Sequence, residues 1–241
     1  MKDIKLIAFD LDGTLTQHKE PLTEENRRVL DALAQRYQLL MVGAGQTRRI
    51  FRQLGEYPID IIGNYGLQYA RYDAQKRDLQ VVRDLQLPCD RESVAQRITE
   101  LRRRFGWETY AGENVEYHPS GCVTFPVLGT KAAQQDKLAF DPDRKKRRAV
   151  YNEVVRAFPE YHVFVGGSSS FDMAPKPYNK YYALDEYCRE LGMNHQQVVY
   201  VGDDYGPGGN DESVYLSDIA FIKVDDYRTF GEKMAPLLTE S

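Results

Sequence analysis

The first apolar segment of the chain, residues 4–9, is the feature that most limits how the chain can fold. It is nearly continuous in apolar side chains, which is typical of a short strand buried in a sheet. It leads directly into the string Asp-Leu-Asp-Gly-Thr at residues 10–14, where two carboxylates one residue apart precede a glycine turn. The pattern predicts a buried strand that ends at a pair of acidic side chains.

Strand and helix patterns alternate after this segment. We expect a helix over residues 23–35 with Thr23 as its N-cap, followed by a second strand over residues 38–42. A helix over residues 47–54 and a strand over residues 59–62 continue the series. This order predicts an α/β fold with a doubly wound, Rossmann-like parallel sheet.

The pattern changes near Pro88 and returns after Pro177. Between them we expect an inserted α+β domain with helices over 91–105 and 143–157 and strand-like segments over 115–125, 162–165 and 170–174. The sheet pattern then resumes with a helix near 181–191 and strands over 198–201 and 219–223. We therefore assign residues 1–84 and 178–241 to the sheet domain and residues 85–177 to the insertion.

Composition and charge favour a protein that acts on a small molecule. The chain has 241 residues, of which 42% are hydrophobic, enough for a substantial core. Its net charge of −4 gives no general attraction to nucleic acid or to an anionic membrane, and we interpret the basic runs at residues 102–104 and 144–148 as solvated helix faces. No apolar run approaches the roughly 20 residues of a membrane span, and no long apolar segment opens the chain, so we expect a cytoplasmic protein. Three scattered cysteines suggest neither a disulfide framework nor a zinc site.

The paired carboxylates indicate phosphoryl transfer. Asp10 would attack phosphorus, and Asp12, aimed differently because the backbone turns at Gly13, would protonate the leaving oxygen. An attacking carboxylate and a phosphate dianion repel each other, so this chemistry requires a cation, and we expect Mg²⁺. The alternative is a plain turn in which an aspartate caps a helix.

The string at residues 10–14 resembles the nucleophile motif of the haloacid dehalogenase (HAD) superfamily. The resemblance implies that Lys180 neutralises the nucleophile and the phosphate. It also implies that the Gly-Asp pair ending at Asp203 holds magnesium. The Mg²⁺ ligands implied in this way are Asp10, Asp203 and the main-chain carbonyl of Asp12.

Two further segments narrow the resemblance to the C2b-capped (type IIB) branch of the superfamily and, within it, to the eukaryotic-type phosphomannomutases. Residues 202–211, Gly-Asp-Asp-Tyr-Gly-Pro-Gly-Gly-Asn-Asp, are similar to an acidic motif of that family, and residues 166–172, Gly-Gly-Ser-Ser-Ser-Phe-Asp, resemble the end of its cap. The residues with roles implied by the resemblance are Ser170 and Asp172 for the sugar, Asn210 and Asp211 for phosphate and metal, and Lys19 in place of a core arginine.

Other positions depart from the family pattern. The residues at its cap arginine positions are His118, Thr130 and Lys137, with Lys131 beside the second. Positive charge is partly kept, but the bidentate geometry of guanidinium groups is lost. In the core, Gly45 replaces a serine, so phosphate would bind backbone N–H groups or Thr47.

We therefore expect a Mg²⁺-dependent phosphatase that hydrolyses a sugar phosphate or a similar small phosphorylated metabolite through an aspartyl-phosphate. Asp12 would first protonate the leaving oxygen and then deprotonate the attacking water. The alternative is a phosphomannomutase-like hexose-phosphate mutase, in which Lys131 and Lys137 help to clamp a second phosphate. A third hypothesis is a catalytically weak sugar-phosphate-binding protein on the same fold. By analogy with the family, the cap could also form a homodimer interface.

Overall fold

The computed structural model describes residues 3–239, which form two compact units. The core unit contains the chain up to Asp84, Asn179–Gly206 and the chain from Asp211 onward, and the cap unit contains Leu85–Tyr178 and Pro207–Asn210. The sequence pattern places the segment Pro207–Asn210 in the sheet domain, but its backbone is bonded within the cap unit. The Val165 N–H donates to the Gly208 carbonyl over 2.8 Å.

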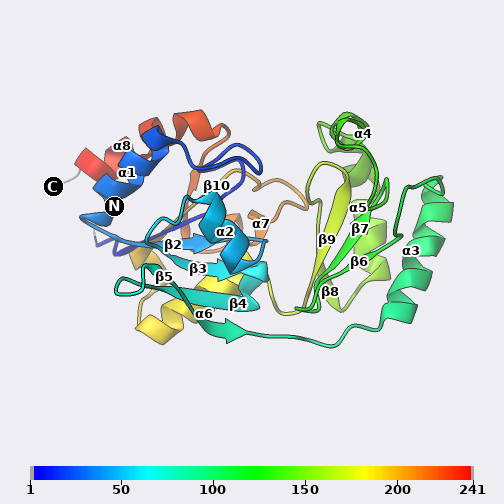
Figure 1. Ribbon diagram of the computed structural model, residues 1–241, viewed down its shortest axis with the longest axis horizontal. Helices are drawn as coiled ribbons and strands as arrows, with labels where there is room; N and C mark the ends of the chain where they lie inside the picture. Colours follow the sequence, from blue (N-terminus) through cyan, green and yellow to red (C-terminus); the bar gives the residue numbers. More distant parts are fainter. Residues whose placement is uncertain (1–2, 240–241) are drawn as a thin grey trace. The chain divides into compact units, whose positions relative to one another are not determined.

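The core unit is built on a seven-stranded sheet in the order β11-β10-β1-β2-β3-β4-β5 (Figure 1). Its parallel strands are β1 (Leu6–Phe9), β2 (Gln38–Val42), β3 (Asp60–Gly63), β10 (Val198–Gly202) and β11 (Ala220–Lys223). The antiparallel strands β4 (Gln68–Asp73) and β5 (Asp78–Asp84) extend it at one edge. The α/β parallel sheet is thus confirmed, and the hairpin is an addition that the strand–helix alternation does not predict.

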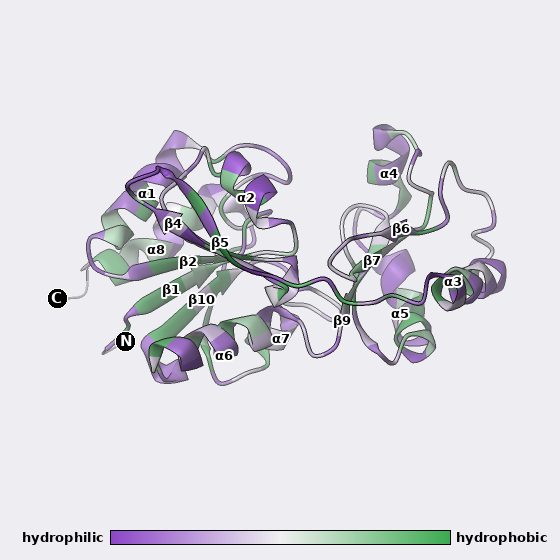
Figure 2. Cartoon of the chain, turned by 60° about the horizontal axis from the view of Figure 1, so that its bottom comes forward, coloured by the Kyte–Doolittle hydropathy of each residue, from purple (hydrophilic) through white to green (hydrophobic). Residues whose placement is uncertain are grey.

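Helices cover both faces of this sheet (Figure 2). They are α1 (Glu24–Ala34), α2 (Thr47–Gln53), α6 (Lys180–Leu191), α7 (Glu212–Tyr215) and α8 (Phe230–Thr239), with short 3₁₀ turns η1 (Asn64–Gly66), η2 (His195–Gln197) and η3 (Tyr227–Thr229). As predicted, Thr23 caps α1, and its hydroxyl accepts the Asn26 N–H over 3.2 Å.

Strand β1 is buried on both faces because its alternate side chains enter two hydrophobic clusters. Ile7 and Phe9 pack with residues of α1, α2 and α8, whereas Leu6 and Ala8 pack with residues of α6 and α7. This explains why its sequence is nearly continuous in apolar residues. It also fixes the carboxyl end of β1, where Asp10 follows, in the middle of the sheet.

The cap unit contains an antiparallel sheet in the order β6-β7-β9-β8. Its strands are β6 (Glu116–Tyr117), β7 (Val123–Pro126), β8 (Tyr161–Phe164) and β9 (Ser170–Pro175), and its helices are α3 (Arg91–Phe105), α4 (Gln134–Phe140) and α5 (Lys145–Ala157). The single strand-like segment predicted over 115–125 is two strands, because the chain turns through Gly121 at a φ of 89°. Side chains of α3 and α5 pack with Phe125 and Phe171 on one face of the sheet.

Two arginines of the basic runs are buried, so the interpretation of those runs as solvated faces is wrong at Arg102 and Arg147. The Arg102 guanidinium donates to the carbonyls of Pro126 and Val127, each over 2.6 Å. That of Arg147 pairs with Asp141 over 2.9 Å. Both charges are compensated by acceptors inside the cap, which is what permits their burial.

Within residues 3–239, no helix combines the length and apolarity needed to cross a membrane.

Candidate active site

The carboxyl ends of β1 and β10 bring the predicted acidic residues together. The two strands are parallel neighbours with Phe9 opposite Val201, and the Asp10 N–H donates to the Val201 carbonyl over 2.9 Å. Asp203 follows β10. Carboxylate oxygens of Asp10, Asp203 and Asp211 all lie within 4.8 Å of one another. The edge of the sheet therefore brings Asp10 together with two carboxylates that lie more than 190 residues later in the sequence.

Lys180 supplies the cation of this cluster. It is the first residue of α6 and is fully buried, and its Nζ donates to Oδ1 of Asp10 over 2.5 Å and to Oδ1 of Asp211 over 2.7 Å. Burial lowers the pKa of Lys180, but the two carboxylates outweigh burial and raise its pKa above the ordinary value. The ammonium group is therefore charged and lies against the predicted nucleophile.

The three carboxylates carry more negative charge than one lysine can balance. Burial raises the pKa of Asp10 well above its usual range, and the negative charges of Asp211 and Asp203 raise it further against the opposing effect of Lys180. Burial, with the neighbouring Asp211 and Asp204, raises the pKa of Asp203 to about 6. A cluster that binds protons this strongly favours a second cation.

The donor set fits Mg²⁺, which prefers carboxylate oxygens. Thr14 donates its hydroxyl to Oδ1 of Asp203 over 3.1 Å, and Gly13, at a φ of 101°, leaves room for that carboxylate where a Cβ would collide with it. Asp10 and Asp203 are thus oriented for an ion. The carboxylate of Asp12 is not a member of this cluster, so any contribution of that residue to the metal rests on its main-chain carbonyl.

The Asp211 carboxylate accepts more hydrogen bonds than its predicted role as a metal ligand implies. Its Oδ1 accepts hydrogen bonds from Lys180 and from the Tyr200 hydroxyl, the latter over 2.6 Å, and its Oδ2 accepts the Asp204 N–H over 3.0 Å. Since a carboxylate oxygen offers about two acceptor sites, only Oδ2 keeps one for a metal. Asp211 therefore anchors Lys180 beside Asp10, with Tyr200 as a partner that the sequence analysis missed.

Asp12 lies in a different environment from Asp10. Its Oδ1 accepts the main-chain N–H of Lys19 and the Nε2 of Gln53, each over 2.7 Å, and its Oδ2 lies 3.7 Å from Nη2 of Arg49. Gln53 and Arg49 both belong to α2. Two carboxylates one residue apart thus have separate partners, which suits one nucleophile and one acid–base group.

The predicted phosphate-binding residues of the core lie in the loop after β1 and between the end of β2 and the start of α2. Lys19 contributes its main-chain N–H to Asp12 from a left-handed conformation with a φ of 62°, and its side chain is exposed. Thr47 is buried, and its N–H donates to Oε1 of Gln68 over 3.2 Å. The Gly45 carbonyl accepts the N–H of the first residue of η1 over 2.9 Å. Because it donates to Gln68, the Thr47 N–H is already hydrogen-bonded.

The cap unit holds the predicted sugar-binding residues. Asp172 accepts the Thr124 hydroxyl over 3.0 Å, and Thr124 lies 3.1 Å from Nε2 of His118. A hydroxyl has one hydrogen, so Nε2 must donate in this chain from His118 through Thr124 to Asp172. Burial raises the pKa of Asp172 against the opposing effects of Thr124 and His118. Ser170 donates its hydroxyl to the Gly166 carbonyl over 3.1 Å, and Asn210 lies in the cap unit as well.

The cap positions expected to bind a second phosphate carry His118, Thr130 and Lys137 rather than arginine, and Lys131 lies beside the second of them. Lys137 donates its Nζ to the Thr130 carbonyl over 3.1 Å, and the Thr130 hydroxyl accepts the Glu113 N–H over 2.9 Å. Lys131, next in the chain, is exposed. These lysines act on a phosphate as point charges, without the fixed fork of a guanidinium group.

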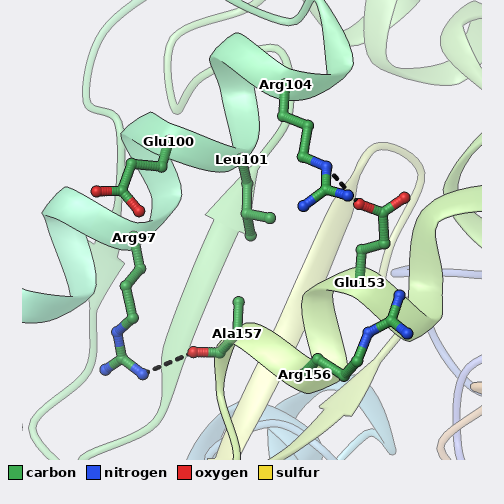
Figure 3. A pocket seen from close by; sticks show the side chains of 7 residues that line it. All are labelled: Arg97, Glu100, Leu101, Arg104, Glu153, Arg156 and Ala157. Carbon is green, nitrogen blue, oxygen red and sulfur yellow. Dashed lines mark hydrogen bonds and ion pairs between the residues drawn. The ribbon is translucent and has the colours of Figure 1, made fainter.

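Arginines elsewhere in the cap are used in helix pairing. Figure 3 shows a groove between α3 and α5 in which Arg97 donates to the Ala157 carbonyl over 2.8 Å and Arg104 pairs with Glu153 over 2.7 Å. Arg97 also pairs with Glu160 over 2.6 Å. Arg97 and Arg104 are each matched by a carboxylate of the cap, so their charges serve structural contacts within the cap unit.

Comparisons with known proteins relate the chain to the phosphomannomutases. A profile of the family described as eukaryotic phosphomannomutase matches residues 27–226. A probable phosphomannomutase of Caenorhabditis elegans is 25% identical over 245 residues, covering 88% of this chain and 87% of that protein. The phosphomannomutase of Saccharomyces cerevisiae is 22% identical over 222 residues, covering 88% of this chain and 85% of that protein.

Solved structures share the fold. A HAD subclass IIB sugar phosphatase superposes with a TM-score of 0.63 at 14% identity, covering 97% of this chain and 98% of the other. A haloacid dehalogenase-like hydrolase of B. subtilis gives 0.65 at 16% identity, covering 97% and 100%. The IMP-bound Plasmodium falciparum IMP-nucleotidase mutant gives 0.70 at 13% identity, covering 98% and 69%. At these identities the likeness establishes the HAD-type fold.

Proposed function

The chain belongs to the eukaryotic phosphomannomutase family, and we propose that it interconverts hexose phosphates by moving a phosphoryl group through Asp10. The observation that carries the proposal is the buried contact of Asp10 with Lys180, beside a separately held Asp12. The curated relatives are named phosphomannomutases and align over most of the chain, which supports a hexose phosphate as substrate.

In the proposed reaction Asp10 forms a bond to phosphorus while the bond between phosphorus and the sugar oxygen breaks. Asp12 gives its proton to that oxygen and later removes a proton from the hydroxyl that receives the phosphoryl group. Lys180 stabilises the negative charge on the nucleophile and on the phosphoryl oxygens. A Mg²⁺ ion held by Asp10 and Asp203 would supply further charge neutralisation at the phosphate.

The cap residues would select the substrate. Asp172, oriented by Thr124 and His118, presents a carboxylate suited to sugar hydroxyls. Lys131 and Lys137 provide positive charge for a second phosphate, which a mutase must hold while the first is transferred. The mutase proposal therefore depends on two lysines that perform the task of a guanidinium clamp.

Hydrolysis of a sugar phosphate is the second candidate, and the missing arginines favour it. Thr130 and Lys137 cannot offer a bidentate contact, and the Lys137 ammonium is already bonded to a carbonyl. A phosphatase needs to bind a single phosphate and to let Asp12 activate a water molecule. Both candidates share the phosphorylated Asp10.

The two candidates differ in their products. The chain, with Mg²⁺, is incubated with mannose 1-phosphate and with glucose 1-phosphate, with and without the matching hexose 1,6-bisphosphate, and both the 6-phosphate isomer and free phosphate are followed. We expect isomer formation that the bisphosphate stimulates and that Asp10→Asn abolishes. Free phosphate without isomer would replace the mutase by a phosphatase. Neither product from folded protein would contradict both candidates and favour a sugar-phosphate-binding protein.

A further inference from the structure

The guanidinium group of Arg49 occupies the space in which a side chain at position 45 would lie. A Cβ on Gly45 would be 2.4 Å from Nη2, 2.6 Å from Nε and 2.9 Å from Cζ of Arg49. Such distances are far inside van der Waals contact. The loop after β2 therefore has no side chain of its own at this position and receives a guanidinium from the following helix instead.

Neighbouring residues hold Arg49 next to the acid–base carboxylate. Its Nη1 donates to Oε1 of Gln53 over 2.8 Å, while Nε2 of the same Gln53 donates to Asp12 over 2.7 Å. Gln53 thus fixes both the arginine and the aspartate. Within residues 3–239, Nε and Nη2 of Arg49 donate no hydrogen bond, and Nη2 approaches Asp12 only to 3.7 Å. These groups have hydrogens to offer to a bound anion.

The adjacent residue of α2 makes a different contact. Arg48 pairs with Asp78 of β5, at the edge of the sheet. The two consecutive arginines of α2 thus have different partners, and only Arg49 lies near a carboxylate that follows β1, that of Asp12. The charge of Arg49 is needed there because Asp10, Asp12 and Asp203 outnumber Lys180 before any phosphate binds.

We infer that Arg49 is a phosphate-binding residue of the core, contributed by α2 in place of a side chain at position 45. Asp12 must reach the ester oxygen that leaves, and the other phosphate oxygens are bonded to the same phosphorus, so a guanidinium beside Asp12 is placed to bind them. Arginine binds phosphate through paired N–H groups and keeps its charge at every working pH. The inference rests on the proposed function for its substrate class, but binding of phosphate itself can be measured without turnover.

Calorimetric titration of the full chain with inorganic phosphate, in the presence of Mg²⁺, tests this assignment. We expect Arg49→Ala to raise the Kd by about tenfold or more, since hydrogen bonds to charged groups contribute roughly 1.5–3 kcal/mol. Arg49→Lys should lie between, because it keeps the charge without the fork. The matched control is Arg52→Ala, which removes the same charge from the same helix at an exposed position and should change the Kd less than twofold.

Equal Kd values for Arg49→Ala and Arg52→Ala would overturn the inference, as would a wild-type chain that binds no phosphate with Mg²⁺. Activity toward hexose phosphates is measured separately. A wild type that turns over none of them contradicts the proposed function, whereas the ratio of phosphate Kd values still decides the role of Arg49. Far-UV circular dichroism and thermal unfolding establish that each variant is folded.

A double-mutant cycle tests the shared space directly. Gly45→Ser should weaken phosphate binding when Arg49 is present, because the added Cβ displaces the guanidinium. In the Arg49→Ala background the same serine should not weaken binding, since the space is free and a hydroxyl donor is gained. An identical effect of Gly45→Ser in both backgrounds would show that the guanidinium does not lie there in solution.

Discussion

Replacing Lys180 by methionine should destabilise the core unit strongly as well as abolish activity. Lys180 is fully buried, and its ammonium lies 2.5 Å from Asp10 and 2.7 Å from Asp211. Methionine fills a similar volume but leaves both carboxylates without their cation. Removing one partner of a buried ion pair costs about 3–5 kcal/mol. For a chain of this size each kcal/mol shifts Tm by about 2–4 °C, so we expect a fall on the order of 10 °C.

The matched variant for this experiment is Asp10→Asn, which also removes activity. Burial and the negative charges of Asp211 and Asp203 raise the pKa of Asp10, so in metal-free protein its ionised form is disfavoured. Asp10→Asn should therefore unfold at the same temperature as the wild type or higher. Thermal unfolding is recorded in EDTA at pH 7.5 and pH 5.5, and acidification should recover part of the loss in Lys180→Met because the stranded carboxylates can then bind protons.

The order of these Tm values decides whether the buried contact exists in solution. We expect Lys180→Met below the wild type and Asp10→Asn at or above it. If Lys180→Met unfolds within about 2 °C of the wild type, the loss is under roughly 1 kcal/mol and the buried pairing is refuted. A large fall in both variants would instead indicate that the Asp10 carboxylate stabilises the fold, contrary to the direction of its pKa shift.

Three further outcomes follow from the site and the cap. Because the pKa of Asp203 is about 6 in the fold and about 4 when unfolded, the metal-free chain should lose stability as the pH rises from about 4 to about 6, and its stability should then level off. Mg²⁺ should bind more weakly as the pH falls through 6. Unfolding series with and without Mg²⁺ measure these two pH dependences, and Asp203→Asn should flatten both of them. Thr124→Val breaks the hydrogen bonds that link His118 to Asp172 and should raise KM for the hexose phosphate roughly fivefold. Thr124→Ser should stay close to wild type, and phosphate binding by the core should not change. An unaltered KM in Thr124→Val would show that these hydrogen bonds do not contribute to substrate binding. Arg147→Met removes a buried ion pair and the donors to the carbonyls of Gly166, Gly167 and Ser170, which lie before and at the start of β9. Hydrogen exchange in this segment should rise in line with a loss of about 3–5 kcal/mol, and unchanged protection would contradict the expectation.

Much of the core fold can be predicted because its central strands are buried on both faces. β1, β2 and β10 read as apolar runs, and each is followed by a turn and a helix. The hairpin of β4 and β5 escapes prediction for a local reason. Its turn contains neither glycine nor proline and ends at Arg77 in a left-handed conformation with a φ of 53°, which the sequence does not predict.

Some residues of the candidate site can likewise be predicted from the sequence, and others cannot. Asp10, Lys180 and Asp203 are expected from motifs, and the structure places them in or beside one cluster. Tyr200 and Gln53 are missed, because a tyrosine inside an apolar strand looks like a core residue and a glutamine near the end of a helix looks like a surface residue. Their roles arise from contacts across neighbouring elements, which no local pattern encodes.

The buried arginines of the cap show a further limit of sequence patterns. Arg102 and Arg147 each lie in a basic run whose other members are mostly exposed, and a run of charges usually lies in solvent. What decides their burial is the supply of acceptors: backbone carbonyls for the first, and carbonyls with a carboxylate for the second. The carbonyl acceptors come from segments about 20 residues away along the chain, beyond the reach of a local charge pattern, whereas the carboxylate of Asp141 lies only six residues before Arg147.

The phosphorylated Asp10 is common to both candidate reactions, and trapping it is the most direct test. The chain, with Mg²⁺, is mixed with glucose 1-phosphate carrying a labelled phosphoryl group, quenched in acid within the first turnover, and digested for mass spectrometry. We predict a hydroxylamine-sensitive phosphoryl label on the peptide that contains Asp10, absent in Asp10→Asn. Product formation with the label on another residue, or with no labelled peptide at any quench time, would contradict transfer through Asp10.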